Sequence, residues 1–138
     1  KPDFYYVITK YKNHKIDQPE KNHCLRKLES YMETHKPYLD PDLTLEALAD
    51  DLSVNPRTLS QLINETYQKN FKSYILEYRI KESMKILADS NHNKLTVLEI
   101  LYQVGFNSKS AFNNQFKQYT NLTPQEFRLK YIPTQQAV

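Results

Sequence analysis

The chain has 138 residues, of which 39% are hydrophobic and 25% charged, and its formal net charge is +3. This composition is ordinary for a globular protein and excludes a membrane-spanning bundle, because no apolar run approaches the roughly 18 residues that a span needs. Cys24 is the only cysteine, which excludes an internal disulfide and favours a reducing compartment. The first residue is Lys1 rather than methionine, and we expect the chain to be a piece of a longer protein.

Charge is divided unevenly along the chain. Between Leu39 and Gln68, six acidic residues stand against Arg57 alone, whereas Lys69 to Val138 carries ten basic and five acidic residues. The C-terminal half therefore suits a polyanionic partner such as nucleic acid better than the preceding stretch does.

The first part of the chain predicts an arm followed by a helix. The run FYYVITKY, Phe4 to Tyr11, is too short and isolated to build a sheet, so residues 1–21 are expected to be a linker or tether. From Asn22 to His35, apolar residues recur every three to four positions, which indicates a helix that Pro37 ends.

Three further helices are expected in the middle of the chain. Thr44 is a natural N-cap for a short amphipathic helix. Asn55 and Pro56 begin a second helix, because proline is favoured at the first helical position. Phe71 to Ala88 has the longest helical pattern, which corresponds to about 27 Å at 1.5 Å per residue.

The remaining sequence predicts three more helices, which brings the expected number to seven, with no convincing strand. Their start signals are Thr96, Ser108 and Thr123, each followed by helical spacing of apolar residues. In the last helix, Phe127 and Tyr131 are expected to point inward.

A repeat relates the two halves of this helical region. The segment LEALADDLSVNPRTLSQLI, Leu45 to Ile63, is matched about 52 residues later by VLEILYQVGFNSKSAFNNQF. Ser53 is equivalent to Gly105, and after one extra residue in the second copy Leu59 is equivalent to Phe112. Each copy is a short helix, a short turn and a second helix, which is the layout of a helix-turn-helix.

Gly105 is the only glycine of the chain and occupies the turn of the second copy. Such a turn requires left-handed backbone, which glycine adopts without steric cost. Ser53 is expected to adopt the same conformation in the first copy at a cost of about 1 kcal/mol.

The predicted fold is therefore all-α and homeodomain-like, with two helix-turn-helix subdomains joined by a long central helix. The expected divisions are a tether over residues 1–21, a first subdomain with the connecting helix over 22–88, a second subdomain over 89–131 and a flexible tail over 132–138.

From about Leu43 to Arg128 the sequence resembles the AraC/XylS-type DNA-binding domain. The spacing GF-x-S-x-S-x-F from Gly105 to Phe112 and the ending Thr123-Pro124 with Phe127-Arg128 carry the resemblance. It implies a sequence-specific DNA-binding transcriptional regulator, an activator, that places the second helix of each motif in a major groove.

The segments KPYLDPDLTL and VGFNSKS more narrowly resemble Bacteroidetes regulators, in which such a domain often follows a sensory or membrane-embedded region. The resemblance thus implies a cytoplasmic domain, and Phe4 to Lys15 would be its incoming tether. The sequence departs from the family at Gln61 and Asn114, where many members carry arginine, and at Gln68 and Asn121, where many carry glycine.

The resemblance implies base contacts from the outer faces of the two recognition helices. Arginine pairs with guanine, whereas asparagine and glutamine pair with adenine, so these faces suit a site with appreciable A·T content. The residues expected to contact bases are Arg57, Ser60 and Gln61 in the first motif and Lys109, Ser110, Asn113 and Asn114 in the second.

Phosphate contacts are expected from helix N-termini and lysines. Thr44 and Thr96 begin the first helices of the two motifs, where free N–H groups favour anions. Lys72, Lys94 and Lys117 would add electrostatic attraction. Two motifs in one chain predict that a monomer binds an asymmetric site on double-stranded DNA, with recognition helices about 34 Å apart.

Two other classes of function are open to this sequence. An enzyme could use Cys24 as nucleophile with His23 or another histidine as base, but a small buried thiol explains Cys24 better. A helical protein-interaction module without DNA binding would suit the acidic stretch Asp40 to Asp51, which is also a candidate contact for RNA polymerase. The four histidines lack ligand spacing, and we expect neither a metal nor a cofactor.

Overall fold

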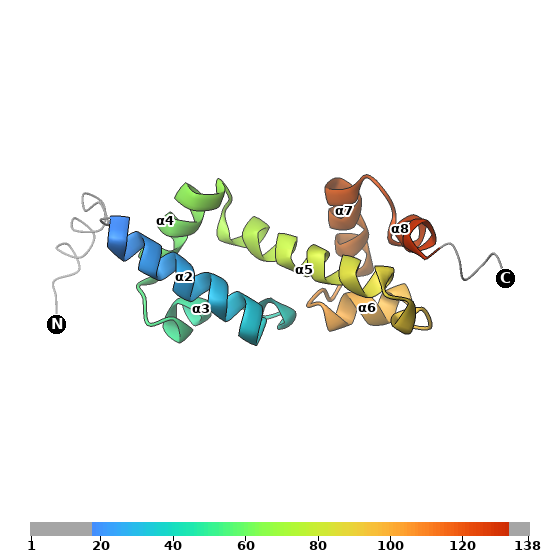
Figure 1. Cartoon of the computed structure of the whole chain (residues 1–138), viewed down its shortest axis with the longest axis horizontal. Helices are drawn as coiled ribbons and strands as arrows, with labels where there is room; N and C mark the ends of the chain where they lie inside the picture. The colour runs from blue at the N-terminus through green and yellow to red at the C-terminus, as the bar shows by residue number, and fades with distance from the viewer. Residues whose placement is uncertain (1–17, 133–138) are drawn as a thin grey trace. The chain divides into compact units, whose positions relative to one another are not determined.

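The computed structural model describes residues 18–132 and contains seven α-helices and no strand in that part of the chain (Figure 1). The predicted all-α, seven-helix fold is confirmed. The strand-like run Phe4 to Tyr11 and residues 133–138 of the expected tail lie outside the described residues. The helices are α2 (Gln18–His35), α3 (Leu45–Asp51), α4 (Pro56–Tyr67), α5 (Phe71–Ala88), α6 (Val97–Gln103), α7 (Lys109–Thr120) and α8 (Pro124–Tyr131), with 3₁₀ turns at Pro37–Leu39 and Ser90–His92.

The helix starts follow the capping residues. Thr44 accepts a hydrogen bond from the backbone N–H of Ala47 at 3.1 Å, and Asn55 accepts one from Arg57 at 2.8 Å. Each bond satisfies a donor that the helix itself leaves unpaired, which fixes where the helix begins. Thr96, Ser108 and Thr123 cap α6, α7 and α8 in the same way.

Helix α2 already includes residues 18–21, which the sequence analysis assigned to the tether. The side-chain amide of Gln18 donates to the Asn22 side chain at 2.9 Å, one turn further on. Pro19 is tolerated because the first turn of a helix needs no donor there, and Glu20 is favoured at the positive end of the helix dipole. Across residues 18–132, no helix combines the length and apolar character that crossing a bilayer requires.

The contacts divide the described residues into two compact units. The first contains residues 18–37 and Leu43–Phe71, and the second contains Tyr38–Asp42 and residues 72–132. All of α5 after Phe71 thus groups with the second motif, whereas the sequence analysis placed the connecting helix with the first. The reason is that Ile80 and Leu87 of α5 are buried in the core of the second unit.

The first unit is built on aliphatic side chains. Helix α3 packs against α4, and α2 is tied to α3 by Lys27, which donates to the backbone oxygen of Leu52, and by Tyr31, which donates to Asp51 at 2.9 Å. The buried side chains of this unit are Leu28, Met32, Leu48, Ala49, Leu52, Leu59, Leu62 and Ile63.

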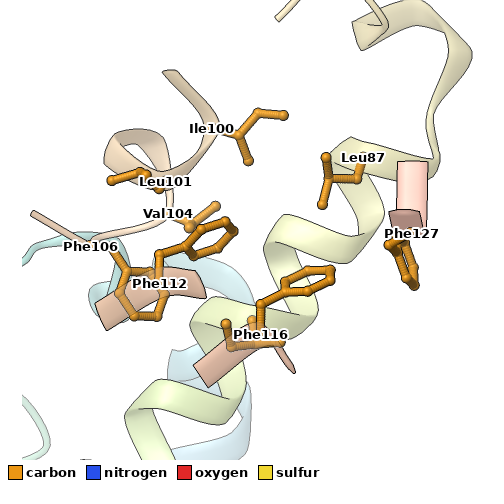
Figure 2. Close-up of a cluster of buried hydrophobic side chains, with 9 residues drawn as sticks. Leu87, Ile100, Leu101, Val104, Phe106, Phe112, Phe116 and Phe127 are labelled. Atoms are coloured by element: carbon orange, nitrogen blue, oxygen red, sulfur yellow. The ribbon is translucent and has the colours of Figure 1, made fainter. Parts of the chain in front are cut away.

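The second unit is built on phenylalanines instead (Figure 2). Phe112 and Phe116 are completely buried, and their ring centroids lie 5.6 Å apart. Phe106 meets Phe112 edge-on at 5.1 Å, and Phe116 meets Phe127 edge-on at 5.4 Å, which are favourable geometries for aromatic pairs. The expectation that Tyr131 points inward is wrong, since its side chain is 51% exposed, although its ring centroid lies 4.4 Å from that of Phe127.

The segment Tyr38–Asp42 belongs to the second unit although it lies between α2 and α3 in the chain. Tyr38 is buried, its ring centroid lies 5.2 Å from that of Tyr78, and its hydroxyl donates to Glu82 at 3.4 Å. Burial and the nearby Glu82 carboxylate raise the pKa of Tyr38 to about 12, because both disfavour the phenolate.

Gly105 lies where this segment meets α5. Its φ is +97°, and a Cβ atom at this position would lie 2.5 Å from the carbonyl oxygen of Tyr38 and 2.7 Å from Nε of Arg79. The Arg79 guanidinium donates to the backbone oxygens of Tyr38 and Asp40 at 2.7 and 2.9 Å. Glycine is therefore required here both by the left-handed backbone and by the close approach of another chain segment.

The first motif has the same turn without the crowding. Ser53 has a φ of +55° and an exposed side chain. The residue after each turn residue closes an equivalent bond, from the N–H of Val54 to Ala49 and from that of Phe106 to Leu101, both at 2.9 Å. The two turns therefore share one hydrogen-bond pattern but differ in φ and in what surrounds them.

We expect Gly105→Val to lower the free energy of unfolding by about 3 kcal/mol or more, because the new side chain meets both a positive φ and the Tyr38 carbonyl. Ser53→Gly should be neutral or stabilise by up to about 1 kcal/mol, because glycine relieves the left-handed strain at an exposed site. Urea unfolding followed by circular dichroism measures both. Similar losses in the two variants would contradict this distinction.

Candidate nucleic-acid interface

Helix α4 separates a buried face from a polar one. Leu59, Leu62 and Ile63 are buried, which commits that side of the helix to the core. Arg57, in the first turn, is exposed, and the sequence-predicted residues Ser60 and Gln61 are partly exposed. The structure thus places the three predicted base-contacting residues of the first motif on one helix, outside its core face.

Gln61 has a partner that the sequence analysis missed. Its side-chain amide nitrogen donates to Oε1 of Glu65 at 3.0 Å, and Oε2 of Glu65 pairs with the ammonium of Lys21 on α2 at 3.4 Å. The four-residue spacing of Gln61 and Glu65 places them on one helix face and could have indicated the first contact. No local signal indicates Lys21, because it lies 44 residues before Glu65.

Helix α7 repeats this arrangement over the aromatic core. Phe112 and Phe116 are buried, whereas Lys109, Ser110 and Asn114 are exposed and Asn113 is partly exposed. The hydroxyl of Ser110 lies 3.1 Å from that of the N-cap Ser108, so the first turn of the helix already orders this side chain.

Helices α4 and α7 both end in left-handed backbone. The C-cap residues are Gln68 with a φ of +53° and Asn121 with a φ of +64°. These are the two positions at which the sequence departs from the glycine that many related domains carry. Asparagine tolerates this conformation better than most residues, and glutamine accepts it at a modest cost.

The predicted phosphate contacts are spread over several elements. Lys72 lies in the first turn of α5, Lys94 lies two residues before the N-cap of α6, and Lys117 lies in the last turn of α7. All three are exposed. Thr44 uses its hydroxyl to cap α3, which leaves only backbone N–H groups of that end for an anion.

Thr96 is occupied by a capping box. Its hydroxyl accepts from the Glu99 N–H at 3.0 Å and donates to Oε1 of Glu99, also at 3.0 Å, while that oxygen lies 3.4 Å from the Thr96 N–H. A carboxylate thus already lies at the helix end that was expected to bind phosphate. The T-x-x-E pattern could have shown this in the sequence. α8 has the same box, and hydrogen bonds from the Thr123 backbone and side chain lower the pKa of Glu126.

The surroundings of Cys24, the residue that suggested an enzyme, are apolar. Cys24 is partly buried on α2 and lines a small apolar pocket together with Lys27 and Leu62. Within residues 18–132, no three histidine, cysteine or acidic side chains gather as a metal site would require.

The family described as "Helix-turn-helix domain" matches residues 48–130. The "Uncharacterized HTH-type transcriptional regulator YdeC" of Bacillus subtilis is 31% identical over 114 residues, which are 81% of this chain and 37% of that protein. "Histidine kinase P4" of Formosa agariphila is 31% identical over 62% of this chain and 6% of its own length. The chain therefore spans well under half of each of these relatives.

Solved structures share the fold. The C-terminal domain of the two-component response regulator yesN from Fusobacterium nucleatum matches with a TM-score of 0.65 at 26% identity, over 77% of this chain and 98% of that one. The family match covers more than half of the chain, and it agrees with the resemblance that the sequence motifs indicated. The chain belongs to the AraC-type family of helix-turn-helix DNA-binding domains.

Proposed function

We propose that α4 and α7 are the recognition helices of a transcriptional activator and that each places its N-terminal turns in a major groove of the target DNA. One observation carries this proposal: each helix buries one face completely and leaves a polar face at its first turns. A groove-reading helix needs both features, because the buried face fixes its orientation and the polar face meets base edges.

In the first motif, Arg57 suits a guanine, whose O6 and N7 accept two hydrogen bonds, and Gln61 suits an adenine. In the second motif, Asn113 and Asn114 suit adenines, whereas Lys109 suits a guanine. Ser60 and Ser110 can donate or accept and would adapt to their neighbours. These faces together favour a site of mixed sequence with adenines under both helices.

We propose that lysines supply most of the phosphate contacts, chiefly Lys117 on α7, with Lys72 and Lys94. The helix N-termini at Thr44 and Thr96 would contribute less to phosphate binding, because α3 and α6 are short and each carries an acidic residue in its first turn. At Thr96 the Glu99 carboxylate competes with a phosphate for the same N–H groups.

We propose that the chain is the DNA-binding part of a longer cytoplasmic regulator, or of the cytoplasmic part of a membrane-anchored one, whose other region senses a signal. The relative named as a histidine kinase, of which the chain matches 6%, supports this arrangement. The acidic α3 of the first unit would contact RNA polymerase. The family supports a binding role rather than catalysis, and Cys24 would be structural.

One chain should bind one DNA site without dimerising, because the repeat supplies two recognition helices. We expect the logarithm of the binding constant to fall with the logarithm of salt concentration with a slope of about −4 to −7, as for about five to eight phosphate contacts. Mobility shifts at several salt concentrations and footprinting measure slope and stoichiometry. A slope near zero would favour a protein-interaction module over DNA binding. A site that needs two copies would refute binding by a monomer.

Substitutions of the base-contacting and of the phosphate-contacting residues should change DNA binding in different ways. On a site selected from random DNA, Arg57→Ala and Asn114→Ala should each lose about 1–3 kcal/mol of binding free energy and relax the preference at one or two base pairs. Lys117→Ala should weaken binding to all sequences and reduce the salt slope by about one. The proposal is wrong if Arg57→Ala and Asn114→Ala relax the same base pair, or if neither relaxes any.

If Thr96 is close to a phosphate, Glu99→Gln should strengthen binding to all sequences by about twofold to fivefold, because a negative charge leaves that helix end. Glutamine retains the capping box, so stability should change little. Glu126→Gln makes the identical change in the capping box of α8 and serves as the control. Equal effects of both substitutions would show a general charge effect, and no effect of either would exclude phosphate at Thr96.

A further inference from the structure

We propose that Glu65, whose charge Lys21 offsets, is a positioning residue that orients the Gln61 amide to select adenine over guanine. The inference rests on the base contact proposed above for Gln61. It assigns a role in base recognition to a carboxylate, a group that DNA phosphates repel. It also gives helix α2, which lies outside the helix-turn-helix itself, a role in offsetting that charge.

The three side chains form a continuous chain of polar contacts in the first unit. The Gln61 amide nitrogen donates to Oε1 of Glu65 at 3.0 Å, and the other carboxylate oxygen lies 3.4 Å from the Lys21 ammonium. The two oxygens of one carboxylate thus hold residues from two different helices. Lys21 is the less exposed member of the ion pair, with 25% side-chain exposure against 50% for Glu65.

The carboxylate decides which way the amide of Gln61 faces. An ionised carboxylate only accepts hydrogen bonds, so the nitrogen of the amide must face Glu65 and the oxygen must face away. The amide then has one N–H and one oxygen left for DNA. Adenine offers the complementary pair, an N7 acceptor and an N6 donor, in the major groove.

Guanine offers two acceptors at the same positions, N7 and O6. An amide fixed by Glu65 would direct its oxygen at O6, where two acceptors face each other without a hydrogen between them. A free amide could turn over and donate to guanine, at the cost of a weaker contact with adenine. Glu65 therefore adds selectivity by forbidding the alternative orientation.

Lys21 reduces the repulsion between the Glu65 carboxylate and the phosphates of bound DNA. An unpaired Glu65 would repel nearby phosphates and weaken binding to every sequence. The ammonium of Lys21 offsets that charge without competing for Gln61, because it meets the other carboxylate oxygen.

The second motif lacks this device and provides an internal comparison. With the one-residue shift of the repeat, Gln118 is equivalent to Glu65 and Asn114 is equivalent to Gln61. Gln118 carries no charge and can both donate and accept, so it cannot dictate the orientation of a neighbouring amide.

The test uses the whole chain and duplexes carrying a site selected from random DNA. Gln61→Ala first locates the base pair that Gln61 reads. At that pair, Glu65→Ala should reduce the preference for adenine over guanine by about threefold to tenfold, the effect of one hydrogen bond. Binding of Glu65→Ala to random-sequence DNA should stay equal or become tighter, because a negative charge is lost. If Glu65 had a purely structural role, Glu65→Ala would instead lower the adenine preference, the affinity for random-sequence DNA and the melting temperature together.

Lys21→Met should do the opposite, keeping the base preference while weakening binding to all sequences. Glu33→Ala is the control for Glu65→Ala: it removes one negative charge from the exposed surface of α2 and should leave the base preference intact. Gln118→Ala should leave the preference at the base pair of Asn114 unchanged. If Gln61→Ala alters a preference that Glu65→Ala leaves intact, the positioning role is wrong. If Gln61→Ala alters no preference, the base contact itself is wrong.

Discussion

The second unit depends on one close approach, in which the Arg79 guanidinium binds the carbonyl oxygens of Tyr38 and Asp40 and the Tyr38 carbonyl lies against the backbone of Gly105. A charged donor that satisfies two backbone acceptors is worth more than two neutral bonds, and leaving either partner unpaired after burial is costly. Burial lowers the pKa of Arg79, which shows the desolvation that these bonds must offset. The turn of the second motif is thereby fixed by a segment that precedes it by more than sixty residues in the chain.

The two motifs share a backbone plan and fill it differently. The first uses mainly leucines and isoleucine and has an exposed turn at Ser53, whereas the second uses a chain of phenylalanine contacts, two of which are edge-to-face. Aromatic rings bury more area per residue than aliphatic side chains, which suits a unit whose helices α6 and α8 are only seven and eight residues long. In both, the buried face leaves a polar face at the start of the second helix, and the proposed function rests on that division.

The polar faces also differ in electrostatics. The first motif carries Arg57 and an amide fixed by a neutralised carboxylate, within an acidic stretch of the chain. The second carries lysines and amides in a basic stretch. Phosphate attraction is independent of sequence, whereas base readout depends on side-chain orientation. In the proposed function, the second motif would therefore supply more of the affinity and the first more of the selectivity.

Local signals in the sequence determined the helices other than the first turn of α2, together with their caps and the two turns, because each depends on residues within about four positions of one another. The family followed from motifs spread between Leu43 and Arg128. The outer faces of α4 and α7 followed from the same periodicity. Tertiary structure alone decided that Tyr38–Asp42 groups with the second unit, that a Cβ at Gly105 would meet the Tyr38 carbonyl, and that Lys21 reaches Glu65. These contacts join residues far apart in the chain, and no spacing rule connects them. They form because the packed cores bring these groups together, where buried carbonyls and charges must then find partners.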